Sequence, residues 1–421
     1  MTAALNAYLG QLAAYAELHG VIAVFADGAP LAQRAFGLAD SQGTARNEID
    51  RRFRIGSLSK SFTAAAILAL AQRGRLDLAD PVARYLPDCG IDPRISLLQL
   101  LQHRSGLGNH TALPDYWPTL MQTRHTPEAL IRRVTATPLL AEPGDATHYS
   151  NTGYLALARV AELVGGQPYY TLLDTLFWQP LGLSRTGTLA SADTQGHQLL
   201  PTRPHAAPLD ASVALGAYDL AASADDLARW WTALVAGEVL DARHAAAMLD
   251  GPAGGFGCGW WLDELVVDGQ RWRSVGYMGD VNGYTAMLLG LPAPHLCAVV
   301  LFNTSSTPAL ATAPRMLGLA LGESWPNYPP AIAMAAPWGS GDYRNPDGGA
   351  LQLDTEQGCL SMARDYGMAC RYRIRPYADC GAAQYWRADA FDEHIELHRD
   401  GRLRLIAPDG TAQDYVRETD R

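Results

Sequence analysis

The segment Phe53-Arg-Ile-Gly-Ser-Leu-Ser-Lys-Ser-Phe-Thr-Ala-Ala-Ala66 decides both the fold and the chemistry expected of this chain. Gly56 permits a tight turn, and the run that follows Leu58 is strongly helix-forming. A helix that begins near Ser57 places Lys60 one turn later on the same face. The helix dipole and burial both disfavour an ammonium ion there, so the lysine can accept the serine proton. We therefore predict a nucleophile and its base; the alternative is an N-capping serine beside a solvated lysine.

Length and composition describe a globular chain with more than one domain. Its 421 residues exceed one ordinary core, and it is 48% hydrophobic and 18% charged. The formal net charge is −10 and Lys/Arg residues form no block, which argues against nucleic acid or an anionic membrane surface as a partner. The longest apolar run is too short for a transmembrane helix, so none is predicted.

The N-terminal segment predicts a helix that stays in the folded protein. Leu5, Leu9, Leu12 and Ala16 recur at helical spacing. The segment lacks both the basic n-region and the continuous apolar h-region of a signal peptide. On this basis we predict a cytoplasmic location, provided that no upstream leader has been trimmed.

The cysteine pattern predicts free thiols. The six cysteines form no C-x-x-C pair and no Cys/His cluster with zinc spacing. We therefore expect neither a metal nor a cofactor. Cys359, Cys370 and Cys380 lie close together in the sequence, so a single disulfide among them is an alternative to free thiols.

The order of predicted elements indicates an α+β domain with an inserted helical lobe. An Asp27-Gly28 turn joins strands over 21–26 and 31–36. Residues 75–245 are mostly helices and loops. Strands return at 259–262, 264–267, 284–289 and 296–302, before a closing helix over 308–322. This order gives one antiparallel sheet backed by terminal helices, with a site between sheet and lobe.

The last quarter of the chain has a different texture. Residues 326–337 are proline-rich and predict a linker between a first domain at 1–325 and a second at 338–421. Short alternating segments separated by Asp-Gly turns follow the linker. They predict a small all-β domain of the sandwich or barrel type.

Two further motifs supply what a serine–lysine hydrolase needs besides its nucleophile. Tyr149 can transfer protons when it lies near a lysine, and Asn151 can bind both the lysine and a substrate amide. The glycine-rich segment 275–284 lets a strand approach a ligand closely. The alternatives are an N-cap with an ordinary packed tyrosine, and a simple glycine-rich hairpin.

With these motifs in this order, the chain resembles serine β-lactamases and penicillin-binding proteins over roughly residues 15–322. It is most similar to their branch of esterases, D-amino-acid peptidases and class C β-lactamases. The segments that carry the resemblance are 53–64, 76–87, 97–107, 149–154 and 180–183. The resemblance implies a β-lactamase/transpeptidase-like sheet flanked by helices. The C-terminal domain resembles the small lipocalin-like barrels of some relatives.

The resemblance also implies roles for individual residues. Ser57 would form the acyl-enzyme, Lys60 would be its base, and Tyr149 would pass a proton to the leaving group. Asn151 would hold the substrate amide. Tyr277-Met278-Gly279 matches the family's strand motif, so the backbone N–H groups of Ser57 and Asp280 would bind the oxyanion.

One departure from the family pattern narrows the expected substrate. Tyr277 stands where β-lactamases and transpeptidases usually have a lysine that pairs with a substrate carboxylate. Asp280 adds a negative charge that would repel anionic substrates and attract a free amino group. We therefore predict a serine hydrolase of ester or amide bonds, acting on D-amino-acid or peptide substrates rather than as a β-lactamase or DD-peptidase.

Two other functions remain open at this point. One is an acyltransferase or peptide cyclase of secondary metabolism with the same machinery, and the other is a catalytically silent binding protein. A dry cleft would favour an amine over water, and four residues are either its lining or core: Trp117, His148, Trp260 and Trp261. The expected partner is a small-molecule or peptidyl acyl substrate. The β-domain could cap the cleft, support a homodimer or only pack against the first domain.

Overall fold

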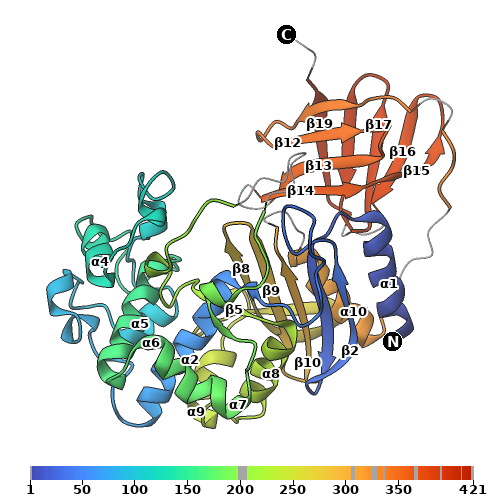
Figure 1. The fold of residues 1–421 in the computed structure, drawn as a ribbon. Helices are drawn as coiled ribbons and strands as arrows, with labels where there is room; N and C mark the ends of the chain where they lie inside the picture. Colours follow the sequence, from blue (N-terminus) through green and yellow to red (C-terminus); the bar gives the residue numbers. More distant parts are fainter. Residues whose placement is uncertain are drawn as a thin grey trace.

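A seven-stranded antiparallel sheet lies at the centre of the larger part of the computed structural model (Figure 1). The structure describes residues 2–197, 206–304, 309–324, 330–334, 337–364, 368–388, 391–408 and 410–418. The strands are β1 (Gly20–Ala26), β2 (Ala29–Phe36), β6 (Gly255–Phe256), β7 (Trp261–Val267), β8 (Gln270–Val281), β9 (Tyr284–Leu291) and β10 (Leu296–Phe302). Their spatial order is β2-β1-β10-β9-β8-β7-β6.

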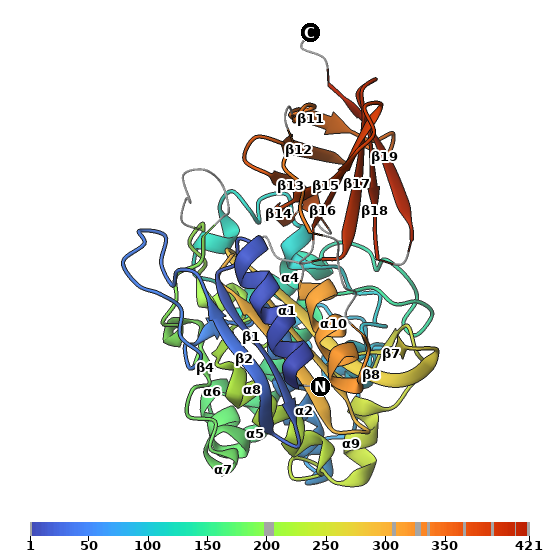
Figure 2. The same cartoon turned by 90° about the vertical axis from the view of Figure 1, so that its right-hand side faces the viewer.

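Helices cover both faces of this sheet (Figure 2). One face carries α1 (Thr2–Tyr15) and α10 (Ala309–Leu321). The lobe on the other face contains α2 (Ser59–Gln72), α3 (Leu97–Leu101), α4 (Pro127–Thr135), α5 (Asn151–Gly165), α6 (Tyr169–Leu173), α7 (Gln179–Leu181), α8 (Ala224–Val235) and α9 (Ala242–Leu249). A three-stranded sheet of β3 (Phe53–Arg54), β5 (Leu220–Ala222) and β4 (Gly187–Thr188) lies beside α2.

The alternation of side chains in β1 explains the two helical layers. Val21, Ala23 and Phe25 join the hydrophobic core beneath the lobe. Ile22 and Val24 point the other way and join the core that contains α1 and α10. Because β1 is apolar on both faces, the sheet needs a helical layer on each side. The fold predicted from the sequence, an antiparallel sheet with terminal helices and a helical lobe, is therefore confirmed.

The turn between β1 and β2 is the one that the sequence predicted. Asp27 and Gly28 have φ of 49° and 77°, the positive values that a two-residue hairpin with this twist requires. The first helix is also as predicted, since Leu5, Leu9 and Leu12 of α1 are buried.

The C-terminal part is a nearly closed nine-stranded antiparallel barrel. Its strands are β11 (Gly341–Arg344), β12 (Ala350–Asp354), β13 (Cys359–Arg364), β14 (Met368–Arg373), β15 (Arg375–Asp379), β16 (Ala383–Ala388), β17 (Glu393–His398), β18 (Arg402–Ile406) and β19 (Ala412–Arg417). The order is β14-β13-β12-β11-β19-β18-β17-β16-β15. The predicted all-β domain is thus present, while its likeness to lipocalins stays a prediction.

The barrel shares a hydrophobic core with the helices behind the large sheet. Leu9 of α1, Met316 of α10 and Leu397 of β17 belong to one buried cluster. The barrel sits over one end of α1 and α10 (Figure 1, Figure 2), and a β-bridge joins Ala16 to Tyr372. The domain boundaries remain a proposal, and residues 326–329 and 335–336 of the expected linker lie outside the described residues.

The described residues bear on two further expectations, concerning a disulfide bond among the cysteines and a membrane-spanning helix. Cys359 and Cys380 are free thiols, as are Cys89, Cys258 and Cys297. The side chain of Cys370 lies outside the described part of the chain. Among the helices that the structure describes, none combines the length and the apolar character needed to cross a membrane.

Candidate active site

Ser57 lies in a 3₁₀ turn that leads into the first long helix of the lobe. The turn η1 spans Gly56–Leu58, and α2 begins at Ser59, two residues later than the sequence predicted. The Ser57 Oγ accepts a hydrogen bond from Lys60 Nζ at 3.0 Å and lies 2.7 Å from Tyr149 Oη. Ser57 caps neither η1 nor α2 and Lys60 is fully buried. The alternative of a capping serine beside a solvated lysine is therefore wrong.

Three acceptors surround the side-chain nitrogen of Lys60, the only lysine in the chain. Besides Ser57, Nζ donates to Asn151 Oδ1 at 2.7 Å and to the Ala217 carbonyl at 2.7 Å. Burial lowers the pKa of Lys60 well below its usual value, and the buried carboxylate of Asp219 opposes this shift. Because an amide oxygen and a carbonyl can only accept, a neutral Lys60 would turn its lone pair toward the Ser57 hydroxyl.

The segment before α5 places Tyr149 on the far side of Ser57. Ser150 caps the helix, because its Oγ accepts a hydrogen bond from the Gly153 N–H at 3.1 Å. Tyr149 is 37% exposed, and Lys60 Nζ lies 4.9 Å from the centre of its ring. Ser150 is therefore the helix cap, and Tyr149, the residue before it, lies against Ser57, while its role in proton transfer stays a prediction.

Asn151, the first residue of α5, is oriented by contacts at both ends of its amide. Its Oδ1 accepts from Lys60, and its Nδ2 donates to Thr111 Oγ1 at 3.3 Å. The side chain is nearly buried, at 8% exposure. The structure thus brings Asn151 to the lysine, while its contact with a substrate amide stays a prediction.

The glycine-rich end of β8 packs directly against the turn that carries Ser57. A Cβ on Gly279 would overlap the Ile55 carbonyl oxygen and lie 3.2 Å from Ser57 N. A Cβ on Gly56, where φ is 51°, would lie 2.7 Å from Asp280 N. Glycine is therefore required on both segments. This contact brings the backbones of Ser57 and Asp280 side by side.

Asp280, at the end of β8, is exposed as a residue, but protein atoms surround part of its carboxyl group. Alternation along the strand directs it to the face opposite Tyr277. The surrounding protein displaces water from the carboxyl and raises the pKa of Asp280 to about 6. Asp280 is therefore a carboxylate at neutral pH that gains a proton in mildly acidic solution.

Tyr277 reaches from β8 into the group of rings around Tyr149. Its hydroxyl lies 3.2 Å from His103 Nε2, and burial together with the neighbouring Tyr149 raises the pKa of Tyr277 well above its usual value. The other ring nitrogen, His103 Nδ1, accepts a hydrogen bond from the Ser150 N–H at 3.1 Å. No role for His103 was predicted from the sequence. The only sequence signal was a histidine just after a short apolar segment. In the structure this residue follows α3 with a positive φ of 54°.

Aromatic rings continue from Tyr149 toward the surface along β6 and β7. The Phe256 ring centre lies 4.7 Å from that of His103, 5.8 Å from that of Tyr277 and 6.2 Å from that of Tyr149. Trp261 follows at 4.9 Å from Phe256 and is 37% exposed. We call Phe256 and Trp261 the aromatic wall.

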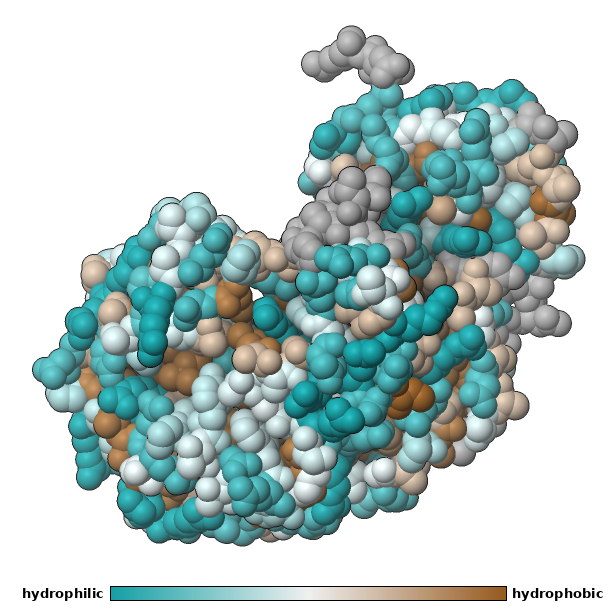
Figure 3. Space-filling view, viewed as in Figure 1, coloured by the Kyte–Doolittle hydropathy of each residue, from teal (hydrophilic) through white to brown (hydrophobic). Residues whose placement is uncertain are grey.

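The four residues proposed as lining or core have different environments. Trp260 is fully buried and belongs to the core, whereas Trp117 is 63% exposed on the lobe. His148 is partly buried, and Trp261 is part of the aromatic wall. Figure 3 shows the surface hollowed between the lobe and the sheet, with hydrophobic residues at the edge of the hollow.

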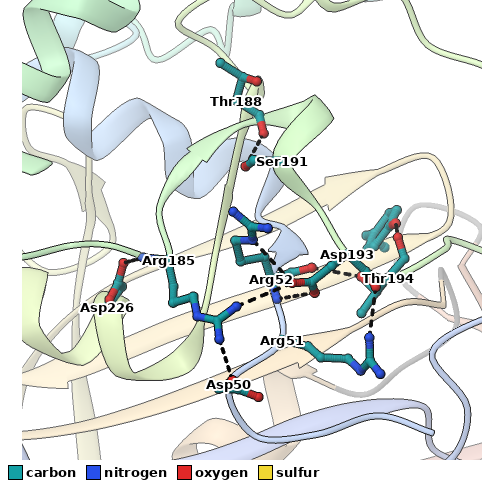
Figure 4. A network of polar contacts seen from close by, with 10 residues as sticks. Asp50, Arg51, Arg52, Arg185, Thr188, Ser191, Asp193, Thr194 and Asp226 are labelled. Atoms are coloured by element: carbon teal, nitrogen blue, oxygen red, sulfur yellow. Dashed lines mark hydrogen bonds and ion pairs between the residues drawn. The ribbon is translucent and has the colours of Figure 1, made fainter. Parts of the chain in front are cut away.

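A polar network fixes the chain that leads into Ser57 (Figure 4). The Asp193 carboxylate accepts from the Arg52 N–H at 2.7 Å and from Arg52 Nε at 3.3 Å. Thr194 Oγ1 donates to the Arg52 carbonyl at 3.0 Å. Arg185 pairs with Asp50 at 2.7 Å. Two separate segments thereby hold residues 50–54 in place, which fixes the approach to the 3₁₀ turn.

The sequence profile of the beta-lactamase family matches residues 5–322. The chain belongs to the beta-lactamase family. It is 31% identical to esterase EstB of Burkholderia gladioli over 213 residues, which cover 45% of this chain and 52% of the esterase. It is 26% identical to the D-aminopeptidase of Brucella anthropi, over 89% of this chain and 72% of that protein. The sequence resemblance to this family is therefore confirmed.

A solved structure shares the fold of this beta-lactamase family member along nearly its whole length. The octameric penicillin-binding protein homologue from Pyrococcus abyssi superposes with a TM-score of 0.66 at 21% identity, covering 98% of this chain and 99% of that one. Against the first curated relatives, the chain spans between 52% and 62% of their own length. The relatives of this family member thus include an esterase and a D-aminopeptidase.

Proposed function

We propose that this protein cleaves ester or amide bonds through an acyl-enzyme on Ser57. The observation that carries the proposal is the position of Ser57 Oγ, 3.0 Å from Lys60 Nζ and 2.7 Å from Tyr149 Oη. Both neighbours can exchange protons, and the serine lies at an accessible tyrosine rather than inside the core. A buried amine and a phenol on either side of a hydroxyl support nucleophilic catalysis.

In the proposed first half-reaction, Lys60 takes the Ser57 proton while Oγ forms a bond to the substrate carbonyl carbon. The carbonyl electron pair moves to oxygen, where the N–H groups of Ser57 and Asp280 would stabilise it. The intermediate then collapses, the bond to the leaving group breaks, and Tyr149 gives its proton to that group. The proton that Lys60 took from Ser57 then returns to Tyr149, which restores the neutral amine and the neutral phenol. Water repeats these steps and releases the acid.

The proposed substrate is neutral or bears an amine. Tyr277 supplies a hydroxyl and no positive charge, so a substrate carboxylate would have no cation to pair with at this position. Asp280 would attract a protonated amino group through space, because its carboxylate lies on the strand face opposite Tyr277. The aromatic wall lies beside Tyr149, the proposed donor to the leaving group, which supports an apolar or aromatic leaving group. A D-aminoacyl or peptidyl ester or amide with a free amino group and an apolar leaving group would match these properties of the site.

Acyl transfer to an amine is a second candidate function. The observation in its favour is the carboxylate of the exposed residue Asp280, whose charge would raise the local concentration of protonated amines near the site. An acyltransferase or peptide cyclase of secondary metabolism would use the same Ser57 acyl-enzyme as the hydrolase. Product analysis with and without an added amine separates the two functions.

The test is a panel of acyl esters, D- and L-aminoacyl amides, a peptidyl thioester and nitrocefin. Wild type should turn over at least one ester or aminoacyl substrate, and Ser57→Ala should lose several orders of magnitude in rate. Ser191→Ala, a serine in the polar network of Figure 4, is the matched control. A fluorophosphonate adduct on the Ser57 peptide is expected by mass spectrometry. A folded wild type with no turnover and no adduct would instead support a silent binding protein.

Location and assembly stay predictions of the sequence. The cytoplasmic location is tested by fractionating cells that express the natural protein. The homodimer is tested by light scattering, in which twice the mass of 45.4 kDa is expected. The octamer named for the Pyrococcus abyssi homologue is the alternative outcome.

A further inference from the structure

A chain of hydrogen bonds with a fixed direction runs through His103 to Tyr277, beside Tyr149. It begins at the Ser150 N–H, which can only donate, and which lies 3.1 Å from His103 Nδ1. Nδ1 is therefore unprotonated, and the ring hydrogen of a neutral imidazole sits on Nε2. That hydrogen points to Tyr277 Oη at 3.2 Å. The hydroxyl hydrogen of Tyr277 is then left for another acceptor. Tyr149 is the neighbour that can take it, because both tyrosines lie against the His103 and Phe256 rings.

The surroundings keep each member of this chain neutral. His103 is 1% exposed, and its ring centre lies 4.5 Å from that of Tyr149 and 5.0 Å from that of Tyr154. Burial and the nearby Lys60 lower the pKa of His103 well below its usual value. Burial also raises the pKa of Tyr277 well above its usual value. Both side chains therefore remain neutral hydrogen-bond donors throughout the pH range of a working hydrolase.

We propose that His103 and Tyr277 are positioning residues that hold a hydrogen-bond donor on Tyr149 Oη, in place of a cation. The inference rests on the proposed function, because it concerns the moment when Tyr149 has given its proton to the leaving group. The oxygen is then a phenolate, and a donated hydrogen bond stabilises it. Lys60 ends this state by returning a proton, so no charge accumulates over the cycle.

Several titratable groups besides this pair face Tyr149. They are Lys60 on α2, Tyr154 on α5 and Tyr218 in the segment before β5, with Asp219 behind the lysine and Cys258 beside Tyr154. Lys60 is the one cation among these described groups. The pKa of Lys60 can be measured separately in the Tyr277→Phe variant. A change in the pH profile of that variant can therefore be assigned either to the lost Tyr277 hydroxyl or to Lys60.

The first test compares two tyrosine-to-phenylalanine variants in one group of rings. Tyr277→Phe removes the donor to Tyr149. Tyr154→Phe removes a hydroxyl that instead donates to the Leu101 carbonyl at 2.7 Å. For Tyr277→Phe we expect kcat/KM for the best ester to fall roughly 10- to 100-fold, the worth of one hydrogen bond to a charged oxygen. The basic limb of the pH–rate profile should move to higher pH. Tyr154→Phe should leave that limb in place.

The second test uses two substitutions of His103 that each preserve one ring nitrogen. His103→Asn can still accept from the Ser150 N–H but cannot reach Tyr277. His103→Gln can place an amide N–H near the position of Nε2. The asparagine variant should behave like Tyr277→Phe, and the glutamine variant should recover most of the rate and the original pH limb. Thermal melting of each variant shows that it is folded.

Identical pH profiles for Tyr277→Phe and Tyr154→Phe would overturn the proposal. Equal rates and profiles for His103→Asn and His103→Gln would overturn it as well, and this pair decides if Tyr277→Phe does not fold. Failure of the proposed function looks different. In that case the wild type itself would show no turnover and no fluorophosphonate adduct on Ser57.

Discussion

At the scale of single residues, the lowered pKa of Lys60 favours its proposed role as a base but reduces the stability of the folded protein. Burial lowers its pKa in the folded state below the value of 10.5 that it has in the unfolded chain. Between those two values the unfolded state binds more protons, so the contribution of Lys60 to stability improves as pH rises. At neutral pH the same shift increases the fraction of the amine that can act as a base.

The ionisation of Lys60 can be observed directly, because the chain has no other lysine. Protein labelled with ¹³C at lysine Cε should give one side-chain resonance, which we expect to titrate well below 10.5. A resonance that titrates at the ordinary value would contradict the assignment of Lys60 as base. Lys60→Arg keeps a cation that cannot deprotonate, so it should reduce kcat by about 10²- to 10⁴-fold.

Asp280 predicts a pH dependence in mildly acidic solution. Its pKa is raised to about 6 from 3.8, so the folded state binds more protons in that interval and loses stability as pH rises through it. Asp280→Asn should be more stable than wild type at pH 7 and similar to it below pH 4. The ratio of rates for amine-bearing and amine-free substrates should rise near pH 6 in wild type only. An unchanged ratio in Asp280→Asn would disprove attraction of the amine.

At the scale of elements, the contact between η1 and the end of β8 forms the proposed oxyanion site. Gly279→Ala would drive a methyl group into the Ile55 carbonyl, so we expect a loss of at least about 100-fold in kcat and about 1–3 kcal/mol of unfolding free energy. Gly10→Ala is the matched control, since a Cβ there meets nothing within 4 Å. Within α1 that change should be neutral or stabilising. Kinetics and urea unfolding of both variants check the prediction.

Local sequence signals predicted the elements well and their contacts less well. The Asp27-Gly28 turn and the apolar spacing of Leu5, Leu9 and Leu12 in the first helix are each encoded within a few residues. The start of α2 at Ser59, two residues later than predicted, is not encoded locally. The 3₁₀ turn before it packs against β8, which lies over 200 positions away in the sequence. His103 was missed for the same reason. Its partner in the site, Tyr277, is 174 residues distant, and short-range patterns carry no information about such a pair.

At the scale of the whole molecule, a buried ionic group joins the barrel to the helices behind the sheet. Asp392 of the barrel lies 3.8 Å from Arg315 of α10 and 3.8 Å from Arg387, whose side chain is 2% exposed. Arg315 also pairs with Glu323 at 2.9 Å. The sequence predicted a separate β-domain, but the composition of the linker could not show how closely the two parts pack.

Asp392→Ala should weaken this junction. The buried Arg387 and the partly buried Arg315 would lose a shared carboxylate, which we expect to lower the unfolding free energy by about 1–3 kcal/mol. Asp414→Ala is the control, because its partner Arg404 and Asp414 itself are both largely exposed; its cost should stay below about 1 kcal/mol. Calorimetry should show the barrel and the larger part melting apart only in Asp392→Ala. A single unchanged transition would mean that the apolar contacts alone hold the junction.

The core shared by α1, α10 and the barrel has a consequence for synthesis on the ribosome. Leu5 and Leu9 of α1 emerge first, yet Leu397 of the same cluster emerges almost last. The first helix can pack on β1 and β2 early, but the cluster that it shares with the barrel is complete only after the strands of the barrel have been made. A nascent chain of this kind is exposed to aggregation for longer than one whose N-terminal half folds alone. Moving α1 to the C-terminus by circular permutation should shorten the time between synthesis of the helix and completion of this cluster, and raise the soluble yield.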